Sequence, residues 1–449
     1  NHRTDAYGGS FENRVKYPME VLEAVIREVG GEVPVQIRVS VDEYVEDGMH
    51  SDEVEKVCLM AVEAGVSAVS LSAGCYDAVE YAIQPMYIPQ GFILPFAERL
   101  KAKVSVPVIV AARLNSAQLI EEAVECGRAD IVAIGRGLIA DPQLIRKIER
   151  HDYENIRYCI AGNQGCIDRV LGGQPAHCMV NPVAGEEGSR ALRPKTDDKT
   201  IAVIGGGPAG MQAALTAAER GYRVNLYAKD GLGGKMKMVS ALPEKETFQI
   251  FLDYLTAQIE KSGIRVIEKE VRSCDDIECD EVILATGSSQ IIPPIPGTDK
   301  EHVVCAEEIL SGKAEPKGAA VVIGGGLVGT ETCKYLGELG VKLTLVEKKK
   351  SIADDIGATY VGHMFAKLGE YGVKVITGAT IKEITDDGVA LQDQTIACDT
   401  VVIAAGYRSE RHLKEILEAE YPVHVAGDAL EPGKILDATE QAYLAANRL

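Results

Sequence analysis

No apolar run in the 449 residues approaches the ~18 residues needed to cross a bilayer, so the sequence predicts no membrane-spanning segment. Positive charge is also scarce, since 47 Lys and Arg residues stand against 67 Asp and Glu residues. A net charge of -20 repels phosphate backbones, which argues against a nucleic-acid partner. The eleven cysteines are an odd number, which argues against a secreted disulfide framework and favours reduced cytoplasmic thiols.

Residues 1–150 alternate strand-like and helix-like segments, which predicts an α/β fold. Helical patterns cover 18–29 and 116–126. Apolar runs typical of buried parallel strands cover 33–41, 68–71, 106–112 and 131–134. This organisation fits a (β/α)₈ barrel, but a closed barrel needs eight strands. Either residues 1–150 form another α/β fold, or they are the C-terminal half of a barrel. Because the sequence starts at Asn1 without Met, we expect an upstream part to be missing.

From residue 199 onward the pattern is strand, glycine-rich turn and helix, and it occurs twice, starting near Ile201 and Ala320. In such a turn the first glycine permits the tight bend, and the second lets the backbone approach a pyrophosphate. The third lets helix and strand pack closely, so that the helix N-terminus faces the phosphates. Two such turns predict a module that binds two dinucleotides. The residues expected to contact them are Gly205, Gly207, Pro208, Ala209 and Gly210 in the first turn, and Gly324, Gly326 and Gly329 in the second.

The acid that normally follows the next strand differs between the two copies. Glu347 lies where an acid binds a ribose 2′-hydroxyl, which favours NADH over NADPH. Lys348–Lys350 offer an alternative, because they could accept a 2′-phosphate or simply form a solvated turn. Ala228 stands at the corresponding place in the first copy and cannot bond a ribose. We expect that site to bind its dinucleotide through the phosphates.

Two later segments complete the pattern, a strand that runs into Gly287 and a strand that runs into Gly427 and Asp428. In this order after paired glycine-rich turns, they resemble the FAD- and NAD-linked pyridine nucleotide-disulfide reductase superfold. The resemblance implies an FAD-binding domain at 199–312 and 410–449, an NAD-binding domain at 313–409, and a cofactor contact at Gly234. Because no Cys-x-x-x-x-Cys follows the first helix, we do not expect thiol–disulfide chemistry.

Residues 151–198 lose the α/β alternation and carry three clustered cysteines, Cys159, Cys166 and Cys178. Closely spaced thiolates on an irregular loop can hold an iron–sulfur cluster. A zinc site would use paired Cys-x-x-Cys knuckles, which the sequence lacks. The other interpretation is three unrelated thiols. We therefore predict an iron–sulfur loop followed by a linker.

This loop resembles that of the multidomain Old Yellow Enzyme relatives, namely 2,4-dienoyl-CoA reductase, trimethylamine dehydrogenase and the bile-acid enone reductases. Their loop has four cysteines, and its flanking residues match Asn163, Gln164, Asn181 and Pro182 of this sequence. Gly162 stands where their second cysteine does. The resemblance implies a [4Fe–4S] cluster, which the three cysteines of this sequence would leave incomplete. It leaves open a three-iron cluster, a fourth ligand from His177 or water, or loss of the cluster.

The same resemblance implies FMN on residues 1–150, and Asn1–Arg14 resembles the segment that follows strand four in this family. Arg38 is expected to face the isoalloxazine and to stabilise the reduced flavin. Arg113, Gly135 and Arg136 follow strands, where barrel loops bind phosphate. Tyr76 is the candidate proton donor, because the loop that carries a His in the dienoyl-CoA reductases has none here.

Together these features imply a flavin and iron–sulfur oxidoreductase that takes electrons from NADH. Its cofactors would be FAD, an iron–sulfur centre and FMN, acting in that order. Its substrate would be a small unsaturated molecule with an activated C=C bond, such as an enone, enoate or enoyl thioester, and a homo-oligomer is possible. The alternatives are an amine dehydrogenase of the trimethylamine dehydrogenase type, or a non-catalytic or diaphorase-only flavoprotein fragment.

Overall fold

The computed structural model describes residues 3–449 and divides into two compact units, 3–162 and 163–449. Asn1 and His2 lie outside the described residues. They begin the segment Asn1–Arg14, which resembles the segment that follows strand four in the family. The predicted boundaries of the FAD- and NAD-binding domains lie within the second unit and stay a prediction.

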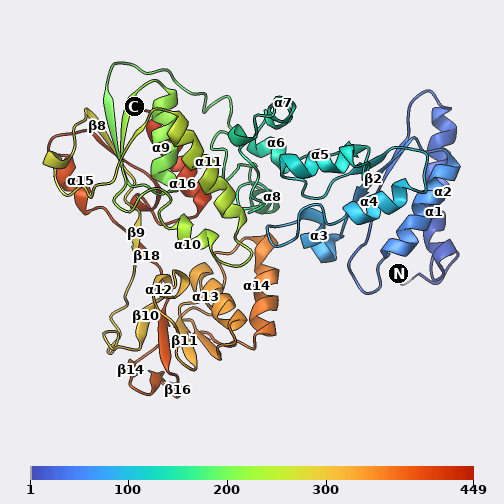
Figure 1. The fold of residues 1–449 in the computed structure, drawn as a ribbon. Coiled ribbons are helices and arrows are strands. Elements are labelled where there is room, and N and C mark those ends of the chain that lie inside the picture. The colour runs from blue at the N-terminus through green and yellow to red at the C-terminus, as the bar shows by residue number, and fades with distance from the viewer. Residues whose placement is uncertain (1–2) are drawn as a thin grey trace. The chain divides into compact units, whose positions relative to one another are not determined.

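The first unit is built on one four-stranded parallel sheet in the order β1-β2-β3-β4, with helices between consecutive strands (Figure 1). An arc of a (β/α)₈ barrel requires consecutive strands to lie next to one another in the sheet, with a helical crossover between each pair. The strands are β1 (Gln36–Ser40), β2 (Ala68–Ser72), β3 (Val108–Val110) and β4 (Ile131–Val132). The helices are α1 (Phe11–Val29), α2 (Ser51–Ala64), α3 (Val79–Ile83), α4 (Leu94–Lys101), α5 (Ala117–Glu125), α6 (Arg136–Ala140) and α7 (Leu144–Glu149).

All four expected strands of the first unit form, although three of them are shorter than their apolar runs. The start of the first helix was predicted wrongly. The helical pattern was placed at 18–29, but α1 begins at Phe11 and contains Pro18. Ser10 caps it, because its Oγ accepts a hydrogen bond from the backbone nitrogen of Asn13 at 3.4 Å. A capping serine ahead of the apolar pattern was the stronger start signal.

The second unit contains two five-stranded parallel sheets of the same design. In each, the strand that enters the glycine-rich turn is central, which confirms the internal duplication. The first sheet has the order β19 (Val423–Val425), β8 (Glu281–Leu284), β5 (Thr200–Ile204), β6 (Arg223–Tyr227) and β7 (Arg265–Ile267). The second has the order β10 (Val303–Cys305), β17 (Thr400–Ile403), β11 (Ala320–Ile323), β12 (Leu343–Val346) and β13 (Lys374–Ile376).

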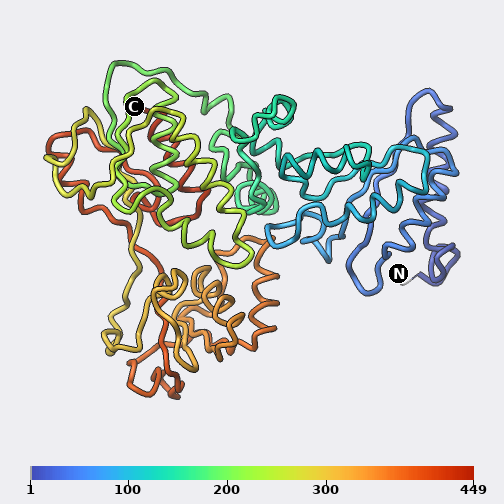
Figure 2. The backbone as a smooth tube through the Cα atoms, viewed as in Figure 1, coloured from blue at the N-terminus to red at the C-terminus, as the bar shows by residue number. Residues whose placement is uncertain are grey.

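The C-terminal segment returns to the first sheet, so that α9 (Pro208–Glu219) and α16 (Ile435–Ala446) lie side by side although far apart in sequence (Figures 1 and 2). A short antiparallel ribbon of β9 (Ser288–Gln290) and β18 (Tyr407–Ser409) marks where the chain passes between the two sheets. The other helices are α8 (Ile167–Leu171), α10 (Met236–Ser240), α11 (Thr247–Lys261), α12 (Ala306–Leu310), α13 (Leu327–Glu338), α14 (Ala358–Glu370) and α15 (His412–Leu417). The remaining strands are β14 (Glu383–Thr385), β15 (Gly388–Ala390) and β16 (Thr395–Ala397).

Buried aliphatic side chains from each sheet form the cores. Val69, Leu71, Val108 and Val110 are fully buried in the first unit, where each side chain contributes about 1.5–3 kcal/mol relative to exposure. In residues 3–449, no helix combines the length and the apolar character needed to span a bilayer.

Candidate functional site

A cleft of about 1800 Å³ in the second unit is lined by both glycine-rich turns. Its walls are built by the loops that follow strands β5, β8, β11 and β17, at the carboxyl ends of the parallel strands. This is the edge at which open α/β sheets bind ligands. Both predicted dinucleotide turns therefore open into one space.

The first turn has the geometry that its glycines predict. Gly205 adopts φ +122°, and a Cβ there would lie 2.1 Å from the carbonyl oxygen of Ala285. A Cβ at Gly210 would lie 1.8 Å from the carbonyl oxygen of Gly205, so only glycine lets α9 pack this closely on β5. Gly207 caps α9, and a Cβ there would meet no atom of residues 3–449 within 4 Å. The N-terminus of α9, beginning at Pro208 and Ala209, is thus open to a phosphate.

The second turn repeats this arrangement. Gly324 adopts φ +109°, and a Cβ at Gly329 would again lie 1.8 Å from the carbonyl oxygen of Gly324. Glu347 follows β12, and its carboxylate accepts hydrogen bonds from the backbone nitrogens of Gly325 at 2.5 Å and Lys349 at 2.7 Å. Two backbone donors therefore hold this carboxylate beside Gly325, and Glu347 lines the cleft.

Ala228 is the counterpart of Glu347 in the first copy and is 1% exposed. A Cβ at Gly206 would lie 2.6 Å from the Ala228 methyl group, so the small side chain packs against the turn. Asp230 lines the cleft two residues further on, but its backbone carbonyl rather than its carboxylate is the acceptor for the Lys237 ammonium at 3.2 Å. The first site therefore has no carboxylate in the position that Glu347 occupies in the second.

The later predicted segments converge on the same edge. Gly427 adopts φ +63°, and a Cβ there would lie 2.5 Å from the Cβ of Ala209 in the first turn of α9. The Asp428 carboxylate accepts hydrogen bonds from Ser288 Oγ at 2.7 Å and from the Gly433 backbone nitrogen at 3.1 Å. Gly234, Gly287 and Asp428 all line the cleft. The fold thus gathers the residues that the sequence assigned to the first dinucleotide.

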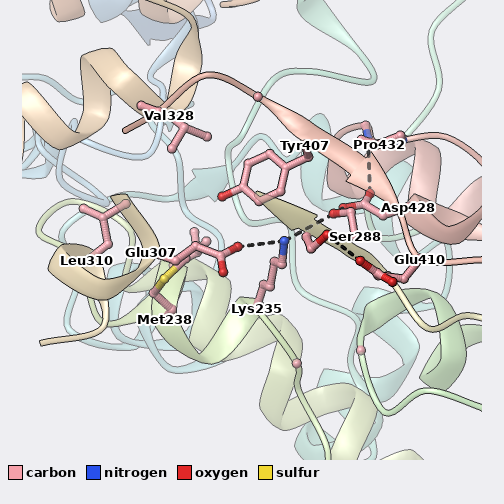
Figure 3. A pocket seen from close by; sticks show the side chains of 18 of the residues that line it. Lys235, Met238, Ser288, Glu307, Leu310, Val328, Tyr407, Glu410, Asp428 and Pro432 are labelled. Atoms are coloured by element: carbon pink, nitrogen blue, oxygen red, sulfur yellow. Dashed lines mark hydrogen bonds and ion pairs between the residues drawn. The ribbon is translucent and has the colours of Figure 1, made fainter. Parts of the chain in front are cut away.

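A network around Lys235 crosses the cleft and was not expected from the sequence (Figure 3). The ammonium lies 2.7 Å from Glu307 Oε1, 3.2 Å from Ser288 Oγ and 3.8 Å from the centre of the Tyr407 ring. Burial, followed by the nearby Glu307 carboxylate, raises the pKa of Tyr407 above its usual range. The position of Lys235 directly after Gly234 was the available sequence signal.

In the first unit, two predicted phosphate-binding arginines hold a loop. Arg113 is buried with φ +49°, and its Nη1 donates to the carbonyl oxygens of Met86, at 2.7 Å, and Ile88. Arg136 Nη1 donates to the carbonyl oxygen of Gln84 at 2.9 Å. Both guanidinium groups therefore order the 84–88 segment beside the carboxyl ends of β3 and β4. Their predicted contacts with a flavin phosphate stay predictions.

The other predicted residues of the first unit lie at strand ends or on strands. Arg38 is exposed on β1, and Gly135 precedes α6 as its N-cap. Tyr76 begins a short 3₁₀ helix after β2 and is fully exposed. Its assignment as a proton donor stays a prediction.

The cysteine loop has strained backbone, because Ala161 and Asn163 adopt φ +53° and +58°. Cys159 Sγ accepts a hydrogen bond from the Ala161 nitrogen at 3.4 Å. In the second unit the backbone next to Cys166 meets that next to Cys178, since the His177 nitrogen donates to the Gly165 carbonyl oxygen at 2.6 Å. Among residues 3–449, no group of three or more His, Cys, Asp or Glu side chains is placed to hold a metal ion.

The contacts of the His177 ring do not support its candidate role as the fourth ligand of an iron–sulfur cluster. Its Nδ1 lies 3.6 Å from a Glu440 carboxylate oxygen, and its Nε2 lies 3.9 Å from one of Glu186. Gly162 contributes no side chain, so the cysteines that the sequence offers in this segment are Cys159, Cys166 and Cys178. This set does not fit a four-iron cluster held by four cysteines.

Comparison with known families assigns both parts of the chain. The model of the NADH:flavin oxidoreductase / NADH oxidase family matches residues 1–155, and that of pyridine nucleotide-disulphide oxidoreductase matches residues 199–425. The chain belongs to the NADH:flavin oxidoreductase family, in the form that carries a pyridine nucleotide-disulphide oxidoreductase module. It is an oxidoreductase and a flavoprotein with flavin- and NADH-binding modules. This confirms the predicted partial FMN barrel followed by a two-dinucleotide module.

Related proteins match nearly the whole chain. The NADH oxidase of Thermoanaerobacter brockii is 39% identical over 460 residues, covering 99% of this chain and 71% of that protein. The cinnamate reductase of Clostridium sporogenes is 32% identical over 475 residues, covering 100% of this chain and 71% of that protein.

Solved structures agree with this assignment. A 2-naphthoyl-CoA reductase in complex with 2-naphthoyl-CoA is 32% identical, with a TM-score of 0.93, over 100% of this chain and 70% of that one. Histamine dehydrogenase from Rhizobium sp. 4-9 is 26% identical, with a TM-score of 0.88, over 100% of this chain and 70% of that one.

Proposed function

We propose that this enzyme uses NADH to reduce an activated carbon–carbon double bond in a small molecule such as an enone, an enoate or an enoyl thioester. The observation that carries the proposal is the second glycine-rich turn with its anchored Glu347, which opens into the same cleft as the first turn. Such a turn suits an enzyme that receives electrons from a nicotinamide dinucleotide. An enzyme that oxidises an amine has no need of that donor.

The names of the relatives support the same substrate class. Cinnamate is an α,β-unsaturated carboxylate, and 2-naphthoyl-CoA is a thioester conjugated to an unsaturated ring. The proteins with these names are 32% identical to this chain, compared with 26% for histamine dehydrogenase. We infer that an electron-withdrawing carboxylate or thioester next to the double bond is what the enzyme recognises.

The residues of the second unit fit two dinucleotides. The open N-terminus of α9 at Gly207 would hold the FAD pyrophosphate, and Asp428 would bond hydroxyl groups of its chain. Glu347 would bond the adenosine ribose of NADH. When bound, these groups supply hydride transfer between nicotinamide and flavin. The protein's own task is to orient both in one cleft and to exclude water from the space between them.

On the first unit we assign FMN contacts to Arg38, Arg113, Gly135 and Arg136. Arg38 is an exposed cation on β1 that would favour the charged reduced form of a flavin. Tyr76 is the candidate that would give a proton to the substrate carbon, because a phenol near a reduced flavin is a plausible general acid. Its full exposure leaves the hydroxyl accessible to a substrate.

We assign Cys159, Cys166 and Cys178 to an iron–sulfur site that lacks one thiolate. Three thiolates alone do not complete a four-iron cluster. None of the eleven cysteines, all within residues 3–449, forms a disulfide, which supports a reducing compartment such as the cytoplasm. A homo-oligomer is part of the same proposal.

The test is anaerobic NADH oxidation by the enzyme with cinnamate or a conjugated thioester as acceptor, followed by mass analysis of the product. A gain of two hydrogens across the double bond is expected. Histamine with a dye acceptor tests the amine dehydrogenase alternative, and NADH with a dye alone tests a diaphorase. Activity only in either of the latter two assays would refute the proposal. The Tyr76→Phe variant should keep NADH–dye activity and lose most double-bond reduction.

A further inference from the structure

The two dinucleotide turns carry opposite charges at one structurally equivalent position. The backbone nitrogen of Gly233 donates to the Gly206 carbonyl oxygen at 2.7 Å, and that of Ala353 donates to the Gly325 carbonyl oxygen, also at 2.7 Å. These bonds align the two loops residue by residue. Lys235 stands two residues after Gly233 in the first copy, and Asp355 stands two residues after Ala353 in the second.

Lys235 and Asp355 face different parts of the cleft. The Lys235 ammonium is directed at Glu307 and Ser288 and leaves the N-terminus of α9 open. The Asp355 carboxylate accepts hydrogen bonds from the backbone nitrogen of Leu327 through both oxygens, at 2.8 and 3.1 Å. Leu327 is the first residue of α13, whereas the first residue of α9 is proline and has no N–H to offer.

The N-terminus of α13 is the end that faces the phosphates of the second dinucleotide in this module. A Cβ at Gly326 would lie 3.2 Å from an Asp355 carboxylate oxygen, so the carboxylate occupies the space beside the turn. It carries the same charge as the phosphate and uses the same donor. Because Asp355 is exposed and lines the cleft, its side chain can move into water without unfolding the loop.

We propose that Asp355 is a built-in competitor for the phosphates of the nicotinamide dinucleotide and sets the affinity of the second site. Binding requires the carboxylate to leave the N-terminus of α13, which weakens binding and speeds release. Within residues 3–449, no carboxylate lies at the corresponding place beside Gly207 in the first site. This difference suits one dinucleotide that stays bound and one that exchanges in every turnover. The inference rests on the proposed assignment of NADH to the second turn.

The experiment compares Asp355→Asn with Asp354→Asn. Asparagine keeps an oxygen for the Leu327 nitrogen and removes the charge. The neighbouring Asp354 is the matched control, because its carboxylate accepts from Ser351 Oγ at 2.9 Å and makes no described bond to the turn. The dissociation constant for NAD⁺ is measured by equilibrium titration in the absence of any electron acceptor.

The Asp355→Asn protein should bind NAD⁺ about two- to fivefold more tightly than wild type at low salt. This gain should shrink at high salt, because screening weakens the repulsion. The FAD content and the affinity of the Asp354→Asn protein should be unchanged.

Unchanged or weaker NAD⁺ binding by Asp355→Asn would overturn the inference and leave the carboxylate as a helix cap. A second variant, Asp355→Ala, separates the two roles, because a cap alone predicts a lower Tm with no gain in affinity. Since NAD⁺ binding needs no turnover, a failure to reduce double bonds would refute the proposed reaction without touching this result.

Discussion

Glu347 and Gly325 are joined by a hydrogen bond of 2.5 Å from the glycine backbone nitrogen to Glu347 Oε2. The bond fixes the carboxylate beside the glycine-rich turn before any nucleotide arrives. Its other oxygen is held by the Lys349 backbone nitrogen at 2.7 Å, so the acid is preorganised on both sides. A fixed negative charge at this place bonds a ribose 2′-hydroxyl and repels a 2′-phosphate.

The first prediction is therefore a preference for NADH over NADPH. Comparing kcat/KM for the two donors with a dye acceptor should show a clear advantage for NADH in the wild type. Glu347→Ala should reduce that advantage, because both the ribose bond and the repulsion are lost. Glu338→Ala, an exposed acid at the far end of α13, serves as the control. A wild-type preference for NADPH would contradict the prediction and assign Lys348–Lys350 to the phosphate.

The second prediction concerns FAD in the first site. We expect FAD to bind despite Ala228, because the turn at Gly207 and the Asp428 carboxylate are intact. Ala228→Glu would place a carboxylate where the second copy has Glu347, and should tighten FAD binding by about 1–3 kcal/mol. Mass analysis of the extracted flavin and an FAD titration of the apoprotein check this. A wild-type preparation without FAD would refute it, and Ala228→Gln controls for side-chain size.

The glycine-rich turns were predictable because their geometry leaves only one residue type possible. A Cβ at Gly210 or Gly329 would lie 1.8 Å from a backbone oxygen, so these glycines report a packing requirement directly. Strands β2 and β3 of the first unit were predictable for a similar reason, because their continuous apolar runs follow from burial, whereas β1 and β4 are partly exposed. The predicted helical pattern at 18–29 missed the start of α1, which begins at Phe11 and contains Pro18.

The side-chain partners in the cleft could not be predicted, because they depend on contacts between distant segments. Lys235, Glu307 and Tyr407 come from three separate parts of the chain and meet only after both sheets form. The equivalence of Asp355 and Lys235 also needed the structure, because an ungapped alignment of the two copies pairs Lys235 with Asp354, and the backbone bonds of Gly233 and Ala353 shift the register by one residue. A sequence pattern predicts that a turn binds a phosphate. It does not reveal that a carboxylate of the same chain already accepts a hydrogen bond from that turn.

The third prediction links stability to pH through Glu244, which lies between α10 and α11. Burial alone would raise its pKa, but hydrogen bonds from His363 and Lys334 outweigh burial and lower the pKa to about 2. The distances are 2.9 Å to His363 Nε2 and 2.5 Å to Lys334 Nζ. Because the folded-state pKa is depressed, the unfolded chain binds the proton more readily. This stabilisation is present above about pH 4.5 and is lost as the pH falls toward about 2.

Urea unfolding between pH 7 and pH 3 measures this effect. Glu244→Gln should lower the free energy of unfolding at pH 7 by about 1–3 kcal/mol, because the Lys334 ammonium, 7% exposed, loses its carboxylate. The variant should also lose less stability than wild type on acidification. Glu370→Gln removes an exposed pair with Lys367 and should change little. Equal pH dependence in wild type and Glu244→Gln would show that this carboxylate does not carry the effect.

The fourth prediction concerns iron. Cys159, Cys166 and Cys178 offer three thiolates, and Gly162 offers none, so the wild type should show low iron content or a three-iron spectrum. Gly162→Cys should raise the content to about four irons per chain, because a fourth thiolate completes the ligand set. Iron analysis and electron paramagnetic resonance of anaerobically purified protein measure both states.

Gly165→Cys is an unsuitable control, because a Cβ there would lie 2.9 Å from the His177 carbonyl oxygen. Gly162→Ser, which adds a side chain of similar size without a thiol, is the matched control and should leave the iron content low. A stable four-iron cluster in the wild type, or unchanged iron in Gly162→Cys, would show that the missing thiolate does not limit the site.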